Sequence, residues 1–286
     1  MRTSNLPVIA AIPNYNMADS LSRLLPQLLK QGYDNIYVLD DASTDNSNQI
    51  VAMFGPKVIW IGGKTNIGSG GNRNRILEAH AGESIIHFLD ADVRLVTTDI
   101  VAKAQQLMDY PNVAFVGGLV LDTKGRQHLW NYGPDSISLY TTLTGQIQYL
   151  FGRIQAPKPI WRKLIRVVTK RARSEWPDIA VPPKRRPVYW SVEGNILVKR
   201  SVLEKLGGFD ETVLEFDIIP LARKAYETCM VSFFDPSISV THFAANVRQY
   251  NREITKQKEL HMLIKRYGGW LKYLFPNGHF KPKHNK

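Results

Sequence analysis

Five short apolar segments, separated by stretches of helical periodicity, constrain the fold of this chain more than any other feature. Each segment is rich in β-branched residues and is bounded by Gly, Asp or Asn, as buried strands are. The segments span 7–12, 35–39, 58–62, 84–89 and 113–120, and helices are expected at 20–32, 45–54 and 71–81. This alternation predicts an α/β protein with an open, doubly wound and mainly parallel sheet, whose ligands bind at the carboxyl ends of the strands.

The first apolar segment and the cysteine content bear on localisation. Residues 6–12 contain a proline and run straight into polar residues, so a buried first strand explains them better than a signal peptide does. No segment approaches the roughly 20 apolar residues of a membrane-spanning helix. The single cysteine, Cys229, excludes a disulfide framework. We therefore expect a cytoplasmic protein.

The chain is strongly basic, with a formal net charge of +12. Nucleic acid, an anionic membrane surface and phosphorylated small molecules are the partners that could explain such an excess. The charge gathers in residues 153–186 and again from Lys256 to the end, and residues 160–176 combine an apolar stripe with basic residues. That pattern predicts either a helix that lies peripherally on the inner face of the cell membrane or a helix that packs on the core with its basic side in solvent.

Two adjacent carboxylates, Asp40 and Asp41, follow the strand predicted at 35–39. At the carboxyl end of a strand they can accept hydrogen bonds from a nucleobase or a ribose. The alternative is that Ser43 or Thr44 caps the next helix. A cap needs only one of these residues, so it does not account for the adjacent acids.

A second acidic pair, Asp90 and Asp92, flanks one small residue after the strand predicted at 84–89. If the strand continues through them, the two side chains point to the same side, since residues two apart in a strand do so. Carboxylates placed in this way suit one divalent cation such as Mg²⁺ or Mn²⁺. An Asp-x-Asp sequence is also common in ordinary loops.

Glycine-rich and acidic segments lie further along. Residues 66–75 (NIGSGGNRNR) allow close backbone approach to a ligand and supply arginines for phosphate, although their spacing is not that of a dinucleotide-binding loop. A glycine-rich turn with solvated arginines is the alternative. Residues 206–211 (LGGFDE) combine two glycines with an aromatic residue, which indicates a packed turn, and more acids follow at 215–217.

Taken in this order, the segments resemble the family 2 glycosyltransferases, which have the GT-A fold. The resemblance covers roughly residues 6–245 and rests on segments PNYN (13–16), DDASTDNS (40–47), NIGSGGNRNR (66–75), DAD (90–92), GNILVKRSVLEKLGGFDE (194–211) and VTH (240–242). It implies a GT-A domain at 1–245, with a nucleotide-binding half at 1–122 and an acceptor-binding half at 123–245. A basic helical extension is expected at 246–286.

The resemblance also implies roles for individual residues. Asp92 and His242 would bind a divalent cation, Mn²⁺ or Mg²⁺, unless His242 is an ordinary core or surface histidine. The residues expected around the donor nucleotide are Pro13, Tyr15, Asp40, Asp41, Asn66, Arg73 and Asp90, and those on the acceptor side are Trp190, Glu193 and Gly194.

The general base is the point at which the sequence departs from the family pattern. Family members usually carry Glu-Asp before the start of a helix, and Asp217 occupies the position of that Asp. Phe216 replaces the Glu, and Ile219 replaces a later Asp. The resemblance therefore implies Asp217 as the base, with Glu215 or Asp210 as alternatives.

The expected activity is inverting, metal-assisted transfer of a sugar from a nucleotide-diphosphate sugar to an acceptor hydroxyl. The resemblance implies a saccharide or lipid-linked saccharide acceptor, in the assembly of bacterial surface polysaccharide or glycolipid. One alternative is a nucleotidyltransferase acting on a sugar phosphate, but its glycine-rich basic loop is missing after the first strand. A non-catalytic relative that binds sugar nucleotides stays open. A nucleic-acid-binding module is not favoured, because the basic stretches are separate from the acidic motifs.

Overall fold

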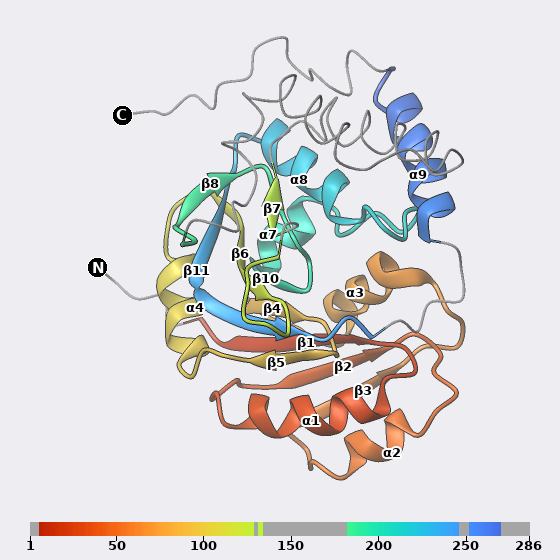
Figure 1. Cartoon of the computed structure of the whole chain (residues 1–286), viewed down its shortest axis with the longest axis vertical. Coiled ribbons are helices and arrows are strands. Elements are labelled where there is room, and N and C mark those ends of the chain that lie inside the picture. The colour runs from red at the N-terminus through yellow and green to blue at the C-terminus, as the bar shows by residue number, and fades with distance from the viewer. Residues whose placement is uncertain (1–5, 129–130, 134–181, 246–251, 270–286) are drawn as a thin grey trace.

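The computed structural model describes residues 6–128, 131–133, 182–245 and 252–269 (Figure 1). Within these ranges the centre of the molecule is a nine-stranded sheet of order β3-β2-β1-β4-β10-β6-β11-β5, with β8 paired to β11. Its strands are β1 (Val8–Asn14), β2 (Ile36–Asp40), β3 (Val58–Gly62), β4 (Ile85–Leu89), β5 (Val93–Leu95), β6 (Val113–Leu121), β8 (Arg186–Val188), β10 (Asn195–Lys199) and β11 (Val231–His242). A separate pair joins β7 (Tyr132–Gly133) to β9 (Trp190–Ser191).

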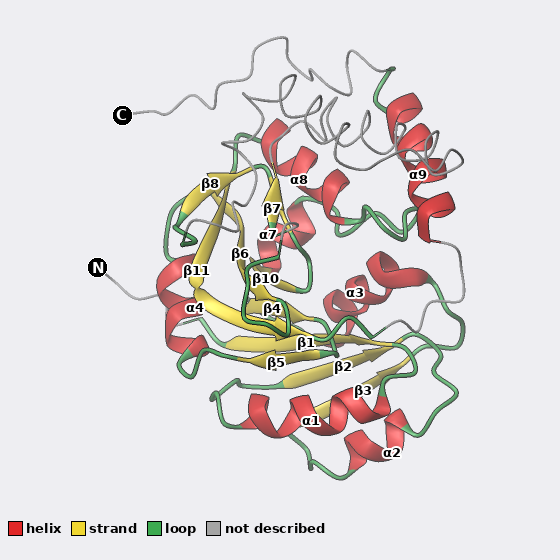
Figure 2. Ribbon diagram, viewed as in Figure 1, coloured by secondary structure: helices red, strands yellow, loops and turns green. Residues whose placement is uncertain are grey.

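Helices cover both faces of the sheet, as Figure 2 shows. One apolar cluster packs α1 (Ala18–Leu29), α2 (Ser47–Ala52) and α4 (Ile100–Met108) against one face. The other packs α3 (Gly68–Ala79), α7 (Arg200–Lys205), α8 (Ile218–Glu227) and α9 (Arg252–Arg266) against the opposite face. The predicted fold class, a doubly wound open α/β sheet, is confirmed. The expectation of a mainly parallel sheet is wrong, because β10 is antiparallel to β4 and β6, and both β5 and β8 are antiparallel to β11. The helix pattern at 160–176 lies outside the described residues.

The strand pairing explains why polar residues gather at one edge. Strands β1, β2, β3 and β4 are parallel, and Asn14 at the end of β1 pairs with Asp40 at the end of β2. Strand β10 lies antiparallel between β4 and β6. The pairing of His242 with Val93 brings the end of β11 beside β5. The carboxyl ends of β1, β2, β4 and β11 therefore border the same region.

All three predicted helices begin or end away from the predicted positions, and α1 spans Ala18–Leu29 rather than 20–32. Helix α3 begins at Gly68, three residues earlier than expected, because the carboxylate of Asp41 accepts hydrogen bonds from Ile67 N and Gly68 N, both at 2.9 Å. Helix α2 is shorter than the predicted 45–54. Among the described residues, no helix combines the length and apolarity required to cross a membrane.

Candidate active site

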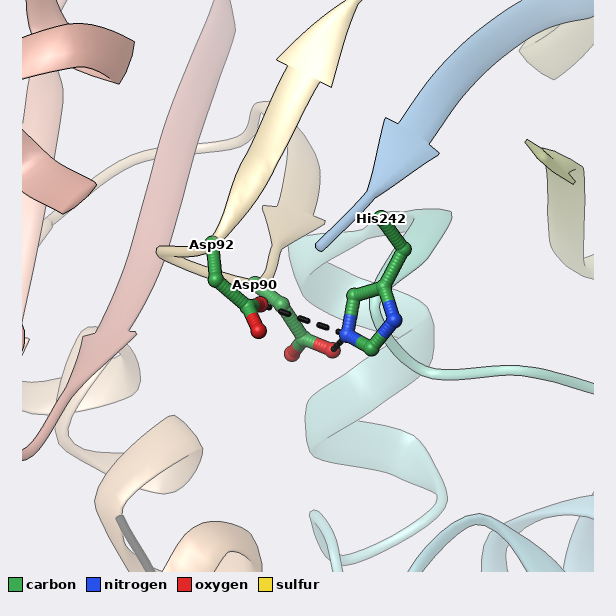
Figure 3. Close-up of side chains that lie close together, drawn as sticks. All are labelled: Asp90, Asp92 and His242. Carbon is green, nitrogen blue, oxygen red and sulfur yellow. Dashed lines mark ion pairs between the residues drawn. The ribbon is translucent and has the colours of Figure 1, made fainter. Parts of the chain in front are cut away.

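Asp90, Asp92 and His242 form a compact cluster at the edge of the sheet (Figure 3). The two aspartates lie in the turn between β4 and β5, so strand alternation, the expected reason for their proximity, does not apply. His242 Nε2 lies 3.2 Å from Asp92 Oδ1 and 3.8 Å from Asp90 Oδ2. One ligand atom from each residue lies within 4.8 Å of the others.

Asp92 is the most firmly held member of this cluster. Its side chain is 4% exposed, and its Oδ2 accepts a hydrogen bond from Ala245 N at 2.6 Å. Its backbone carbonyl accepts a second from Phe243 N at 3.0 Å. Burial opposes ionisation of Asp92, but the hydrogen bonds from His242 and Ala245 outweigh it and hold the pKa of the carboxyl below its ordinary value. Asp92 is therefore an anion fixed in place.

The donor set fits a divalent cation. Two carboxylates and an imidazole offer oxygen and nitrogen ligands of the kind that Mn²⁺ accepts. The side chains of Asp90 and His242 are 32% and 26% exposed, so a ligand can reach them from one side. Gly194 approaches closely from the other side, because a Cβ atom there would lie 2.2 Å from Asp90 Oδ2. Only glycine leaves room for Asp90 as it lies.

Arg73 connects this cluster to the start of α8. Its side chain is 3% exposed, and its two terminal nitrogens reach different carboxylates. Nη2 lies 3.2 Å from Asp90 Oδ1, and Nη1 donates to Asp217 Oδ2 at 2.7 Å. Burial alone would lower the pKa of Arg73, but the charges of Asp217, Asp90 and Glu193 more than compensate and raise it. Arg73 is thus a permanent buried cation.

Asp217 is wholly buried at the position that precedes α8. Its Oδ2 accepts hydrogen bonds from Arg73 and, at 2.9 Å, from Ser69 Oγ. Its Oδ1 is buried and has no hydrogen-bond partner among the described residues. Burial raises the pKa of Asp217 above its ordinary value, although Arg73 and Ser69 oppose the shift. One oxygen is therefore held, and the other has unused capacity to accept a proton.

Phe216, which replaces the Glu of the family pattern, has an apolar environment. Phe216 packs, partly buried, against the apolar cluster on the face covered by α3 and α8.

Of the two alternatives for the base, Asp210 pairs with Arg266 and accepts a hydrogen bond from Thr212 N at 2.9 Å. The backbone N–H of Glu215 donates to Glu259 at 3.0 Å. Asp217, by contrast, pairs with Arg73 at 2.7 Å.

Two of the three residues expected on the acceptor side, Glu193 and Gly194, lie beside the Arg73 ion pairs. Glu193, between β9 and β10, is partly buried. Burial, together with the negative charges of Asp217 and Asp90, raises the pKa of Glu193 to about 8, although Arg73 opposes the shift. Trp190 on β9 is buried against Gly133 of β7.

Of the residues expected on the donor side, some are engaged in hydrogen bonds within the protein and others are exposed to solvent. Asp40 accepts hydrogen bonds from Asn14 Nδ2 at 2.8 Å and from Ser43 N at 2.9 Å, and Asp41 caps α3. The alternative that Ser43 or Thr44 caps the next helix is wrong, since α2 begins at Ser47 and Asp45 Oδ1 accepts the hydrogen bond from Ser47 N, at 3.1 Å. Pro13 near the end of β1 and Tyr15 just after that strand are partly exposed, and Asn66 is exposed before α3.

Three polar residues that matter to this arrangement were not predicted from the sequence. Ser69 contacts the candidate base, and Asn74 donates to the carbonyl of Phe209 at 3.0 Å, which holds the packed turn of 206–211. Glu259 on α9 contacts the segment before Asp217. Each contact joins segments distant in sequence, so local pattern carries no signal for it.

Comparison with known proteins agrees with this arrangement. The sequence model described as glycosyl transferase family 2 matches residues 9–167, more than half of the chain. An N-acetylglucosaminyl-diphospho-decaprenol L-rhamnosyltransferase of Mycobacterium tuberculosis is 26% identical over 257 residues, which cover 85% of this chain and 78% of the relative. An uncharacterized glycosyltransferase of Nostoc sp. is 36% identical over 92 residues, 30% of this chain and 28% of the relative.

Solved structures resemble the whole fold at low sequence identity. A mannosyltransferase of Pyrobaculum calidifontis in complex with GDP-Man and Mn²⁺ has a TM-score of 0.57 and 19% identity, covering 97% of this chain and 66% of the solved one. S. aureus TarS in complex with UDP-GlcNAc has a TM-score of 0.53 and 18% identity, covering 87% of this chain and 61% of the solved one. The chain thus spans just under two thirds of these solved chains.

The fold and the clustered acidic residues define a glycosyltransferase of the GT-A type. The chain belongs to glycosyl transferase family 2, because the family model matches more than half of its length. This membership decides against the nucleotidyltransferase alternative.

Proposed function

We propose that this chain transfers a sugar from a nucleotide-diphosphate sugar to a hydroxyl of a lipid-linked saccharide, with metal assistance and inversion, in the assembly of bacterial surface polysaccharide or glycolipid. The observation that carries the proposal is the juxtaposition of the Asp90–Asp92–His242 cluster with the pair of Arg73 and Asp217. The acceptor class is taken from the rhamnosyltransferase relative, whose name specifies a diphospho-decaprenol acceptor.

Asp90, Asp92 and His242 would hold the divalent cation, and Mn²⁺ suits their mixed oxygen and nitrogen ligands. When bound, the cation stabilises the negative charge that develops on a leaving diphosphate. Arg73 keeps Asp90 oriented through its 3.2 Å contact. Gly194 leaves the space that this carboxylate occupies.

Asp217 would accept the proton of the acceptor hydroxyl at Oδ1, which has no hydrogen-bond partner among the described residues. The hydroxyl oxygen bonds to the anomeric carbon while the bond from that carbon to the phosphate oxygen breaks, and the leaving diphosphate keeps the electron pair. A single displacement of this kind inverts the anomeric configuration. The raised pKa of Asp217 favours proton acceptance compared with an ordinary aspartate. Since Asp217 is fully buried, a hydroxyl reaches it only after neighbouring side chains move.

The exposure of each side chain indicates which residues would contact the substrates. Pro13, Tyr15 and Asn66 would contact the donor nucleotide, while Asp40 and Asp41 would act by holding the loops that surround it. Glu193 would face the acceptor, because it is only partly buried and lies close enough to Asp217 and Asp90 for their negative charges to raise its pKa. The raised pKa of Glu193 favours its protonated form, which can donate a hydrogen bond to a sugar hydroxyl.

A nucleotide panel tests this function directly. The full chain is incubated with UDP, GDP or dTDP, with and without Mn²⁺, and thermal unfolding is followed. One nucleotide should raise the melting temperature in a Mn²⁺-dependent manner. Sugar conjugates of that nucleotide are then tested for transfer to polyprenyl-diphosphate N-acetylglucosamine. Equal melting temperatures under all conditions, and no transfer, would contradict the proposal.

A further inference from the structure

The loop of residues 209–217 carries Asp217 and is held on one side by the start of α3. Ser69 Oγ donates to Asp217 Oδ2 at 2.9 Å and lies 3.4 Å from the carbonyl oxygen of Leu214. A Cβ atom at Gly68 would lie 2.3 Å from the Leu214 side chain, and one at Gly70 would lie 2.7 Å from the carbonyl oxygen of Asp210. The loop therefore packs closely on the glycine-rich segment.

Helix α9 holds the other side of the 209–217 loop through two side chains. Glu259 Oε1 accepts a hydrogen bond from Leu214 N at 2.6 Å, and Glu259 Oε2 accepts another from Glu215 N at 3.0 Å. Arg266 pairs with Asp210 and donates to Thr212 Oγ1 at 2.8 Å. These two residues are about two helical turns apart, so both reach the loop from the same face of α9.

The surroundings of Glu259 make it a fixed anchor rather than a surface acid. Glu259 is 6% exposed. Burial raises the pKa of its carboxyl, against the opposing effect of the N–H groups of Leu214 and Glu215. Its neighbours Leu260 and Leu263 are buried in the same apolar cluster as Ile218, the first residue of α8. A buried carboxylate is tolerated only where donors satisfy it, and here the donors are backbone groups of the loop.

We propose that Glu259 is a positioning residue for sugar transfer, which fixes the 209–217 loop from α9 and thereby sets where Asp217 lies relative to Arg73. The inference rests on the proposed role of Asp217 as the base. Glu215, which Glu259 holds, is two residues before Asp217, so movement of its backbone is passed on to that carboxylate. The cluster of Asp90, Asp92 and His242 is held by strands β4, β5 and β11, so its position does not depend on Glu259.

The structural half of this proposal can be measured without substrates. Glu259→Ala should raise hydrogen exchange of the amides of Leu214 and Glu215, and Glu259→Gln, which keeps one acceptor oxygen, should raise it less. Lys258→Ala is the matched control, because Lys258 is exposed on the same helix. Unchanged exchange at both amides in Glu259→Ala would overturn the proposal.

The functional half uses a double-mutant cycle, with donor and acceptor as in the nucleotide panel. Glu259→Ala should lower kcat by up to about 100-fold, the cost of misplacing a reacting group by about 1 Å, while Mn²⁺-dependent nucleotide binding stays unchanged. Glu259→Gln should recover part of kcat, and Lys258→Ala should match wild type. In an Asp217→Asn background, Glu259→Ala should have little further effect.

The outcomes separate this inference from the proposed function. If Asp217→Asn is crippled but Glu259→Ala is fully active, or if the two losses multiply, the inference fails and the base assignment stands. If Asp217→Asn is fully active, the base assignment and the inference both fail. If Glu259→Ala does not fold, the kcat and exchange of Glu259→Gln decide, and wild-type values for both would overturn the inference.

Discussion

At the residue scale, the candidate site depends on contacts between charged side chains that lie far apart in the sequence. Asp90, Asp92 and His242 lie together, and the structure brings Asp217 within reach of them through Arg73. Arg73 was expected to border the nucleotide, but its guanidinium is engaged with two carboxylates, one of them 144 positions away. No local pattern encodes a pairing of that range, because it depends on how α3 and α8 pack.

The role of Asp92 is testable by a change of charge alone. Asp92→Asn keeps the size of the side chain but removes the anionic charge that His242 contacts at 3.2 Å. We expect loss of Mn²⁺-dependent thermal stabilisation by nucleotide and of most transfer, with the fold retained by circular dichroism. The control is Asp99→Asn, because the side chain of Asp99 is 55% exposed on the surface. Wild-type Mn²⁺-dependent activity in Asp92→Asn would remove the metal assignment.

At the element scale, the positions of five strands along the chain follow from apolar patterns in the sequence, whereas the order of the strands in the sheet does not. The segments of β1, β2, β4 and β6 are apolar runs, interrupted in β4 by His87, since both faces of these strands are covered, whereas β3 at the end of the sheet is mostly only partly buried. Strand β10 was not predicted, and it lies antiparallel between β4 and β6. Its insertion depends on contacts between distant segments, which periodicity does not report. Asn195 supports it by donating to the carbonyls of Leu119 on β6 and Ile238 on β11, at 3.2 and 3.3 Å.

The buried His87 on β4 makes this central region sensitive to acid. It contacts Tyr33 Oη at 2.6 Å and Asn195 Oδ1 at 2.9 Å, and burial lowers its pKa to about 4, with Asn195 opposing the shift. The unfolded chain, with an ordinary histidine pKa of about 6.5, binds a proton first as pH falls. His87 therefore removes about 3 kcal/mol of stability as pH falls from about 6.5 to about 4.

Urea unfolding between pH 7 and pH 4 checks this expectation. The free energy of unfolding of the wild type should fall with pH, and His87→Gln should show a shallower fall, because glutamine does not titrate. His261→Gln is the matched control, since His261 is exposed. Parallel pH profiles for wild type and His87→Gln would show that His87 is not the group responsible.

At the scale of the whole molecule, family membership and fold agree with the sequence, whereas the domain boundary at 245 stays a prediction. Helix α9 lies beyond that boundary, yet its residues Leu260, Leu263 and Ile264 are buried in the core cluster. The net charge of +12 was read as a sign of an anionic partner. The basic stretch 160–176 that motivates a membrane contact lies outside the described residues, so the proposal of a peripheral membrane site rests on sequence pattern and on the acceptor class.

Flotation with liposomes tests that membrane contact. Binding should increase with the fraction of anionic lipid, decrease with salt, and weaken when Lys163, Arg166 and Lys170 are replaced by glutamate. The control replaces Lys30, Lys57 and Lys124, which lie elsewhere in the sequence, by glutamate. Equal recovery with neutral and anionic liposomes would remove the membrane proposal and leave the transferase assignment intact.

The central claim is that Asp217 accepts a proton next to a metal-assisted leaving group, and turnover by Asp217→Asn tests it most directly. Transfer is measured with the nucleotide sugar selected by the panel, and Mn²⁺-dependent nucleotide binding is measured on the same preparation. The account predicts a loss of turnover of about 10²–10⁴-fold with nucleotide binding near that of the wild type. Near-normal turnover in Asp217→Asn, or a loss of turnover in Glu215→Gln instead, would contradict it.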